Sequence, residues 1–182
     1  MVSSIAMISE SAIREASSSK QDDTKTQDEK TIITSSGSTR SYIQVYIFRG
    51  TPDYYHKRHT LLYFTSPDNS EFYETIHVQR FDEKSNWEID QLHSRKVDWV
   101  LSGTYRSHVN AGAVIVPNGH EMRPVDAIAA MPLNRESDPE WNCQHFVFEG
   151  LQTLVDEGLQ TQEWYEVVAE EIAEKLVDGA LG

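Results

Sequence analysis

One cysteine and two of the seven histidines have the residue types and spacing to support nucleophilic chemistry. Cys143 lies where a helix is expected to begin, because Asp138 and Pro139 precede it and Asn142 can cap the helix. The free N–H groups and the positive dipole end of a helix stabilise a thiolate, so this position predicts a lowered cysteine pKa. The same N–H groups can stabilise an oxyanion on an acyl substrate.

His59 and His77 are the histidines best placed to act as a base and its orienting partner. His59 immediately precedes an apolar strand expected over 60–65, and His77 lies near the end of the next strand, expected over 71–79. If the two strands form an antiparallel hairpin, the start of one lies beside the end of the other. We therefore expect the two histidines to be neighbours, and a helix packed across that end of the sheet to bring Cys143 to both.

The same residues also have less specific interpretations. A free cysteine is among the most buried residue types, so Cys143 is alternatively a structural core residue. His145 follows Cys143 on the same helix by two positions and is expected to point away from the thiol, in a packing or capping role. The remaining histidines are expected in polar connections: His56, His93, His108 and His120.

The sequence predicts neither a metal site nor a cofactor. No carboxylate or further histidine has ligand-like spacing beside His59 and His77, and a single cysteine disfavours a thiolate zinc site. No phosphate-binding loop or dinucleotide fingerprint is present.

The order of expected elements predicts an α+β fold, because strands come first and helices afterwards. The strands are expected over 42–48, 60–65, 71–79 and 86–90, with weaker signals over 97–103 and 111–117. The helices are expected over 124–131, from about 138 to a stop at Gly158, and over 162–176. The last helix carries an apolar stripe that is expected to pack on its own domain: Trp164, Val168, Ile172 and Leu176.

Composition divides the chain into two regions. Residues 1–40 are rich in Ser, Thr, Lys, Gln, Asp and Glu and are expected to form a disordered or loosely docked arm. Residues 41–182 are expected to form a single catalytic domain that ends in an acidic amphipathic helix.

Charge and hydropathy narrow the classes of partner and location. The formal net charge of −13 disfavours nucleic acid and anionic membrane surfaces as partners. No segment approaches the roughly 18 uninterrupted apolar residues that a membrane helix needs. The N-terminus lacks the pattern of a secretory signal, and a single thiol suits a reducing compartment, so a cytoplasmic location is expected. The oligomeric state is left open.

Three short blocks resemble the lecithin:retinol acyltransferase-like proteins, which are circularly permuted members of the NlpC/P60 papain-like superfamily. Trp141-Asn-Cys-Gln-His-Phe-Val is similar to that family's Asn-Cys-Glu-His-Phe-Val nucleophile motif. Arg58-His-Thr-Leu-Leu-Tyr-Phe is similar to its His-Trp-Ala-Leu-Tyr strand, and Ile76-His-Val to its second histidine. The order His, His, Cys is the permuted order. The chain is also similar to a group of uncharacterised fungal proteins with an Asp-Pro-Glu-Trp-Asn-Cys-Gln motif.

The resemblance implies a permuted papain-like fold with Cys143 as nucleophile, His59 as general base and His77 as the residue that orients His59. It also implies that the helix start supplies part of an oxyanion hole. Three features depart from the family pattern. Gln144 replaces the Glu of the motif, the loop between the two histidine strands is longer, and the C-terminal segment is acidic where the animal enzymes often carry a membrane helix.

The leading functional hypothesis is a hydrolase or acyltransferase that forms a Cys143 thioester with a small-molecule or otherwise acylated ester, thioester or amide substrate. One alternative is a cysteine peptidase or amidase that uses the same three residues. Another is a catalytically silent interaction domain that keeps the fold and uses the arm and the acidic helix as partner surfaces.

Overall fold

The computed structural model describes residues 37–82, 85–133, 138 and 140–181. Its centre is an antiparallel sheet with the strand order β4-β3-β2-β1-β5. Most of the predicted N-terminal arm, residues 1–36, lies outside the described residues, and the first strand begins before the expected position 42. The strands are β1 (Ser38–Phe48), β2 (His59–Thr65), β3 (Tyr73–Gln79), β4 (Glu88–Leu92) and β5 (Tyr105–Pro117).

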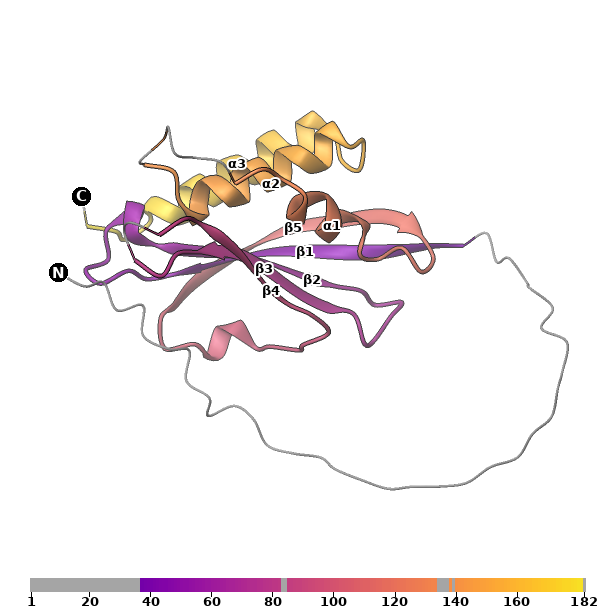
Figure 1. Ribbon diagram of the computed structural model, residues 1–182, viewed down its shortest axis with the longest axis horizontal. Coiled ribbons are helices and arrows are strands. Elements are labelled where there is room, and N and C mark those ends of the chain that lie inside the picture. Colours follow the sequence, from indigo (N-terminus) through magenta and orange to yellow (C-terminus); the bar gives the residue numbers. More distant parts are fainter. Residues whose placement is uncertain (1–36, 83–84, 134–137, 139, 182) are drawn as a thin grey trace, which may run out of the picture.

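The α-helices follow the sheet in sequence and lie on one of its faces (Figure 1). This arrangement confirms the predicted α+β class. The helices are α1 (Arg123–Ala129), α2 (Cys143–Asp156) and α3 (Gln162–Val177). Two short 3-10 helices lie in connections between strands: η2 (Tyr55–Lys57) and η3 (Trp99–Leu101).

The weaker strand prediction over 97–103 is wrong, because this segment contains η3. Asp98 begins η3, and its carboxylate accepts a hydrogen bond from the backbone N–H of Val100 at 3.3 Å. Trp99 is buried, whereas Val100 and Leu101 are exposed. The segment therefore buries one of its apolar side chains in a short 3-10 turn and does not form a strand.

Side chains alternate along the central strands, and both faces of the sheet are covered there. The face that meets the helices carries residues such as Leu62 and Phe64, which belong to the same buried cluster as Phe146 of α2. Burying one such side chain contributes about 1.5–3 kcal/mol. The opposite face carries a smaller, mostly aromatic cluster that Trp99 of the η3 segment covers: Tyr46, Phe48, Leu61 and Tyr63.

Helix α2 begins at Cys143, later than the expected start near residue 138, but the predicted Asn142 cap and Gly158 stop are confirmed. The Asn142 side chain caps the helix by accepting a hydrogen bond from the Gln144 N–H at 2.8 Å. Gly158, with φ of +67°, follows the C-terminus in the left-handed conformation that favours glycine. A Cβ atom at Gly150 would lie 3.0 Å from Cγ2 of Ile128, so glycine allows α1 to approach α2 closely.

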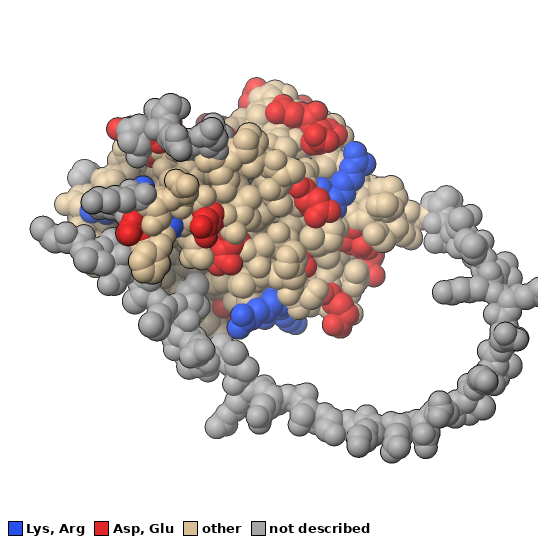
Figure 2. Space-filling view, in the orientation of Figure 1, with Lys and Arg blue, Asp and Glu red and all other residues tan. Residues whose placement is uncertain are grey.

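The apolar stripe of α3 packs on its own domain, as predicted. Val168, Ile172 and Leu176 are buried in the main core, and Trp164 is partly buried. The Trp164 indole also donates a hydrogen bond to the Ala111 carbonyl of β5 at 2.6 Å. None of the helices in the described parts of the chain has the length and apolar character needed to cross a membrane. The face shown in Figure 2 carries more acidic than basic side chains, in keeping with the net charge.

Candidate functional site

Cys143 is the first residue of α2, and its thiol packs against the start of β2. The side chain is buried, and Sγ lies 3.8 Å from the Arg58 carbonyl oxygen, which belongs to the peptide that joins Arg58 to His59. The Thr60 hydroxyl donates a hydrogen bond to the Cys143 carbonyl at 2.9 Å. These contacts join the beginning of α2 to the beginning of β2.

His59 and His77 lie side by side, which confirms the adjacency that the sequence predicts. Strands β2 and β3 pair antiparallel, with Leu62 opposite Ile76. The two imidazole centroids are 5.0 Å apart, and the ring planes meet at 80°. His77 is buried and His59 is partly buried, so the start of β2 and the end of β3 hold the pair away from bulk water.

Asp90 completes this cluster, although no motif in the sequence points to it. Its Oδ2 atom lies 3.2 Å from Nε2 of His77, directly across the β3–β4 ladder, and 3.1 Å from Nε2 of Gln79. The other ring nitrogen of His77, Nδ1, is buried and has no hydrogen-bond partner in the described structure. The fourth strand was expected from the sequence, and only its register with β3 was needed to place Asp90 opposite His77.

Burial controls the ionisation of the three predicted site residues. It lowers the pKa of His59 to about 4. The pKa of His77 is also lowered to about 4, by burial first and then by the neighbouring His59, with Asp90 acting in the opposite direction. Burial raises the pKa of the Cys143 thiol despite hydrogen bonds from Thr60 and the helix N-terminus. The predicted lowering of the cysteine pKa is therefore wrong, because desolvation outweighs the helix dipole.

The resting site thus contains a neutral thiol and neutral imidazoles. Thr60 faces α2, so strand alternation turns His59 toward the other side of β2, where its ring lies 6.2 Å from that of Phe48. Within the described residues, the thiol donates to the Arg58 carbonyl, and no hydrogen bond joins it to an imidazole. The structure therefore brings His59 to His77, and brings Cys143 to the backbone of His59.

The other histidines lie apart from this cluster. His145 is exposed on α2, so of the packing and capping roles that the sequence suggested, the packing role is wrong. His108 lies in β5 rather than in a polar connection, and its Nδ1 is 2.8 Å from the Tyr105 hydroxyl. Nδ1 of His93 lies 2.9 Å from a carboxylate oxygen of the buried Glu74.

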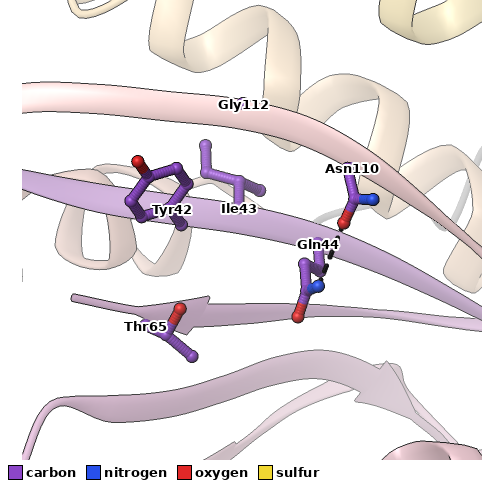
Figure 3. Close-up of a pocket in the computed structure, with 6 residues that line it drawn as sticks. All are labelled: Tyr42, Ile43, Gln44, Thr65, Asn110 and Gly112. Carbon is purple, nitrogen blue, oxygen red and sulfur yellow. Dashed lines mark hydrogen bonds between the residues drawn. The ribbon is translucent and has the colours of Figure 1, made fainter. Parts of the chain in front are cut away.

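A hollow of about 320 Å³ lies elsewhere on the sheet (Figure 3). Its lining includes Thr65, which is six residues along β2 from His59, or about 20 Å at the usual strand rise. Gln44 and Asn110 bridge β1 and β5 there with a 3.0 Å hydrogen bond. The hollow is lined by Tyr42, Ile43, Gln44, Thr65, Asn110 and Gly112, and it is separate from the Cys143 cluster.

Among the described residues, no group of three or more histidine, cysteine or acidic side chains is arranged to hold a metal ion. Comparison with known proteins adds no family assignment: no protein-family model, curated protein or solved structure matches this chain.

Proposed function

We propose that this protein is an acyl-transfer enzyme that works through a thioester on Cys143. The observation that carries the proposal is the contact of the Cys143 thiol, at the N-terminus of α2, with the Arg58 carbonyl oxygen. This carbonyl belongs to the peptide bond that joins Arg58 to His59. The ring of the partly buried His59 lies beside that of the buried His77, which in turn contacts the more exposed Asp90. The proposal takes Cys143 as the nucleophile, His59 as the base and His77 with Asp90 as the groups that orient the base, with the thiol and the His59 ring on opposite sides of β2 in the resting structure.

The reaction begins when the Cys143 proton moves to a ring nitrogen of His59 and Sγ attacks the carbonyl carbon of an ester, thioester or amide. The C–S bond forms as the carbonyl π electrons move onto oxygen, and free N–H groups at the start of α2 stabilise that oxyanion. Collapse of the tetrahedral species expels the leaving group, which takes the proton from His59 and leaves a thioester. Water or an amine then attacks the thioester, with His59 as base, and the protonated thiol returns.

The neutral resting pair supports general-base catalysis rather than a preformed thiolate–imidazolium pair. Burial raises the pKa of Cys143 and lowers the pKa of His59, so the thiol gives up its proton only as it attacks. The mechanism requires the His59 ring to turn toward the thiol. Nδ1 of His77, which has no partner within the described structure, is then available to bond and orient that ring.

A direct experiment is to detect the thioester. The protein would be incubated separately with an activated short-chain ester, an acyl thioester and a peptide amide, and then acid-quenched and examined by intact mass and peptide mapping. We expect an acyl adduct on Cys143 that is absent in Cys143→Ala and strongly reduced in His59→Ala. His145→Ala is the matched control, because His145 is an exposed histidine near the start of the same helix, and it should acylate like the wild type. An adduct that persists in Cys143→Ala would contradict the proposal.

The three substrate arms also separate an acyltransferase or esterase from a peptidase or amidase. Acylation by the ester and thioester alone would support the leading proposal, and acylation by the peptide amide would assign the same residues to a peptidase or amidase.

A non-catalytic interaction domain is the second candidate, and the burial of the thiol favours it. Cys143 is only 7% exposed, and its raised pKa keeps it protonated and weakly nucleophilic. Under this candidate no substrate class would acylate the protein, and Cys143→Ala would leave its biological activity unchanged.

A further inference from the structure

The side chain of Gln144, the residue after the proposed nucleophile, bonds the segment that connects β1 to β2. It is buried, and its Nε2 atom lies 2.7 Å from the Tyr55 carbonyl oxygen and 2.8 Å from the Arg58 carbonyl oxygen. A side-chain amide carries two N–H donors on that nitrogen, so both are used. The Gln144 backbone N–H is bonded as well, because it donates to the Asn142 cap.

The chemistry of these contacts distinguishes glutamine from glutamate. Both partners of Nε2 are carbonyl oxygens, which only accept hydrogen bonds. An ionised carboxylate at this position would place negative oxygen against both of them in a buried environment, and it could donate to neither. Gln144 is also the position at which this chain departs from the nucleophile motif that it resembles.

The Arg58 carbonyl is the acceptor that Gln144 shares with the Cys143 thiol. The rest of the connecting segment is held by different contacts. The Arg58 guanidinium forms two hydrogen bonds with Asp53 and donates to three carbonyls at the C-terminal end of α3. At Gly50 a Cβ atom would lie 2.6 Å from the Lys57 carbonyl oxygen, so the segment closes tightly on itself. Gln144 joins this compact segment to the first turn of α2.

We propose that Gln144 is a positioning residue whose amide fixes the Arg58–His59 peptide against the Cys143 thiol. The effect of Gln144 on catalysis rests on the function proposed above. The effect of Gln144 on the geometry of residues 54–60 does not depend on that function. The test therefore has a structural arm, which needs no substrate, and a kinetic arm.

The structural arm measures amide hydrogen exchange over residues 54–60 in Gln144→Glu and Gln144→Met, each relative to wild type at the same pH. We expect exchange to be about tenfold faster in both variants at about pH 8, because buried carbonyls lose their donors. Near pH 5 the introduced carboxyl, which burial makes easier to protonate, regains one O–H donor. The excess exchange of Gln144→Glu should then fall to a few-fold, while that of Gln144→Met stays near tenfold.

The fall in the excess exchange of Gln144→Glu between about pH 8 and pH 5 can be assigned to the introduced carboxyl rather than to the titratable groups around it. His59, with its pKa lowered to about 4, is mostly neutral over this range, and burial raises the pKa of the Cys143 thiol, which favours its protonated form. The two residues whose carbonyls accept from the Gln144 amide are an arginine and a tyrosine, and side chains of these types ordinarily titrate well above pH 8. Gln152→Glu, at a partly buried position further along the same helix, is the control and should exchange like wild type in this segment.

The kinetic arm measures acylation of Cys143 by the substrate that gives an adduct with wild type. We expect Gln144→Met to slow acylation by about tenfold at every pH, and Gln144→Glu to recover part of that loss near pH 5.

Exchange at the wild-type rate over residues 54–60 in both variants would overturn the proposal. Faster exchange over this segment with an unchanged rate of acylation would also overturn it. If wild type forms no adduct at all, the function proposed above fails, and the exchange result alone decides whether Gln144 holds the segment. Should Gln144→Glu fail to fold, as shown by unprotected amides in α3, Gln144→Met alone decides between these outcomes.

Discussion

The imidazole rings of His59 and His77 meet edge to face, with centroids 5.0 Å apart and planes at 80°. His77 is buried and His59 is partly buried; burial lowers the pKa of both rings, and a charge on His59 lowers the pKa of His77 further. The pair is therefore held uncharged at neutral pH, although an ordinary histidine titrates near 6.5. Several measurable properties follow from this neutrality.

The first prediction is that the protein loses stability as the pH falls from about 6.5 toward 4. The folded pKa of each histidine lies below its unfolded value, so the unfolded chain binds more protons in this interval. The stabilising contribution is complete above about pH 6.5, and for one such histidine it amounts to about 3 kcal/mol. Urea unfolding at a series of pH values measures the slope.

Carboxylates titrate in the same interval, so the contribution of the two histidines to the pH dependence of the free energy of unfolding must be measured separately. In a double variant, His59→Gln with His77→Gln, the free energy of unfolding should depend much less on pH between 6.5 and 4. His145→Gln removes an exposed histidine and should keep the wild-type slope. An equal slope in the double variant would show that these histidines are not the cause.

The second prediction concerns the acidic limb of the proposed reaction. A general base with a pKa of about 4 remains unprotonated through most of the acidic range. The rate of Cys143 acylation should therefore fall with a midpoint near pH 4 rather than near 6.5. Stopped acylation reactions analysed by intact mass would give this profile over the pH range in which circular dichroism shows the protein folded. A midpoint near 6.5 would mean that the base is a solvated histidine and not the buried His59.

The third prediction is that Cys143 reacts slowly with iodoacetamide in the folded protein. Its thiol is buried, and burial raises its pKa, so little thiolate is present and the reagent has poor access. At about pH 7.5 alkylation should be at least about tenfold slower in the native protein than in the same protein unfolded in urea. Mass spectrometry of timed aliquots measures both rates. Faster alkylation of the native protein would indicate a thiolate stabilised by the helix, as the sequence alone predicts.

The contrast between sequence and structure at this thiol has a simple physical origin. The helix start could be predicted because Asn142 and the residues around it act locally. The environment of Cys143 could not, because it depends on β2 packing over the helix end, far away in sequence. The effect of the helix dipole on the Cys143 pKa is local and can be predicted from the sequence. The larger effect of desolvation depends on tertiary packing and cannot.

The histidine cluster divides in the same way. The neighbouring positions of His59 and His77 follow from one hairpin, so the strand pattern was enough to predict them. The contact with Asp90 depends on the register between β3 and β4, which their apolar pattern does not specify. The strand prediction around Trp99 is wrong because three apolar residues in a row are also typical of a strand, although only one of these three is buried.

The fourth prediction is that Arg58→Met destabilises the protein by about 3 kcal/mol. Arg58 is buried, and the substitution removes its ion pair with Asp53 and its hydrogen bonds to the end of α3. Arg106→Met is a matched control, since Arg106 also bonds Asp178 but in a more exposed pair, and it should cost no more than about 1 kcal/mol. Urea unfolding of the two variants gives the comparison. Equal losses would show that the buried position of Arg58 adds nothing.

The last prediction tests whether Asp90 acts on the site through His77. Asp90→Asn keeps the shape of the side chain but removes the charge that raises the pKa of His77 and favours its Nε2–H tautomer. We expect the pKa of His77 to fall further and its tautomer population to change, both of which are visible in the nitrogen chemical shifts of the ring. Acylation of Cys143 should slow by about 10- to 100-fold, the equivalent of one hydrogen bond to a charged group. Glu88→Gln, on the same strand and the same face, should leave the tautomer and the rate unchanged. If Asp90→Asn altered the rate without altering the tautomer of His77, Asp90 would act by another route, because the contact across β3 and β4 is with His77 itself.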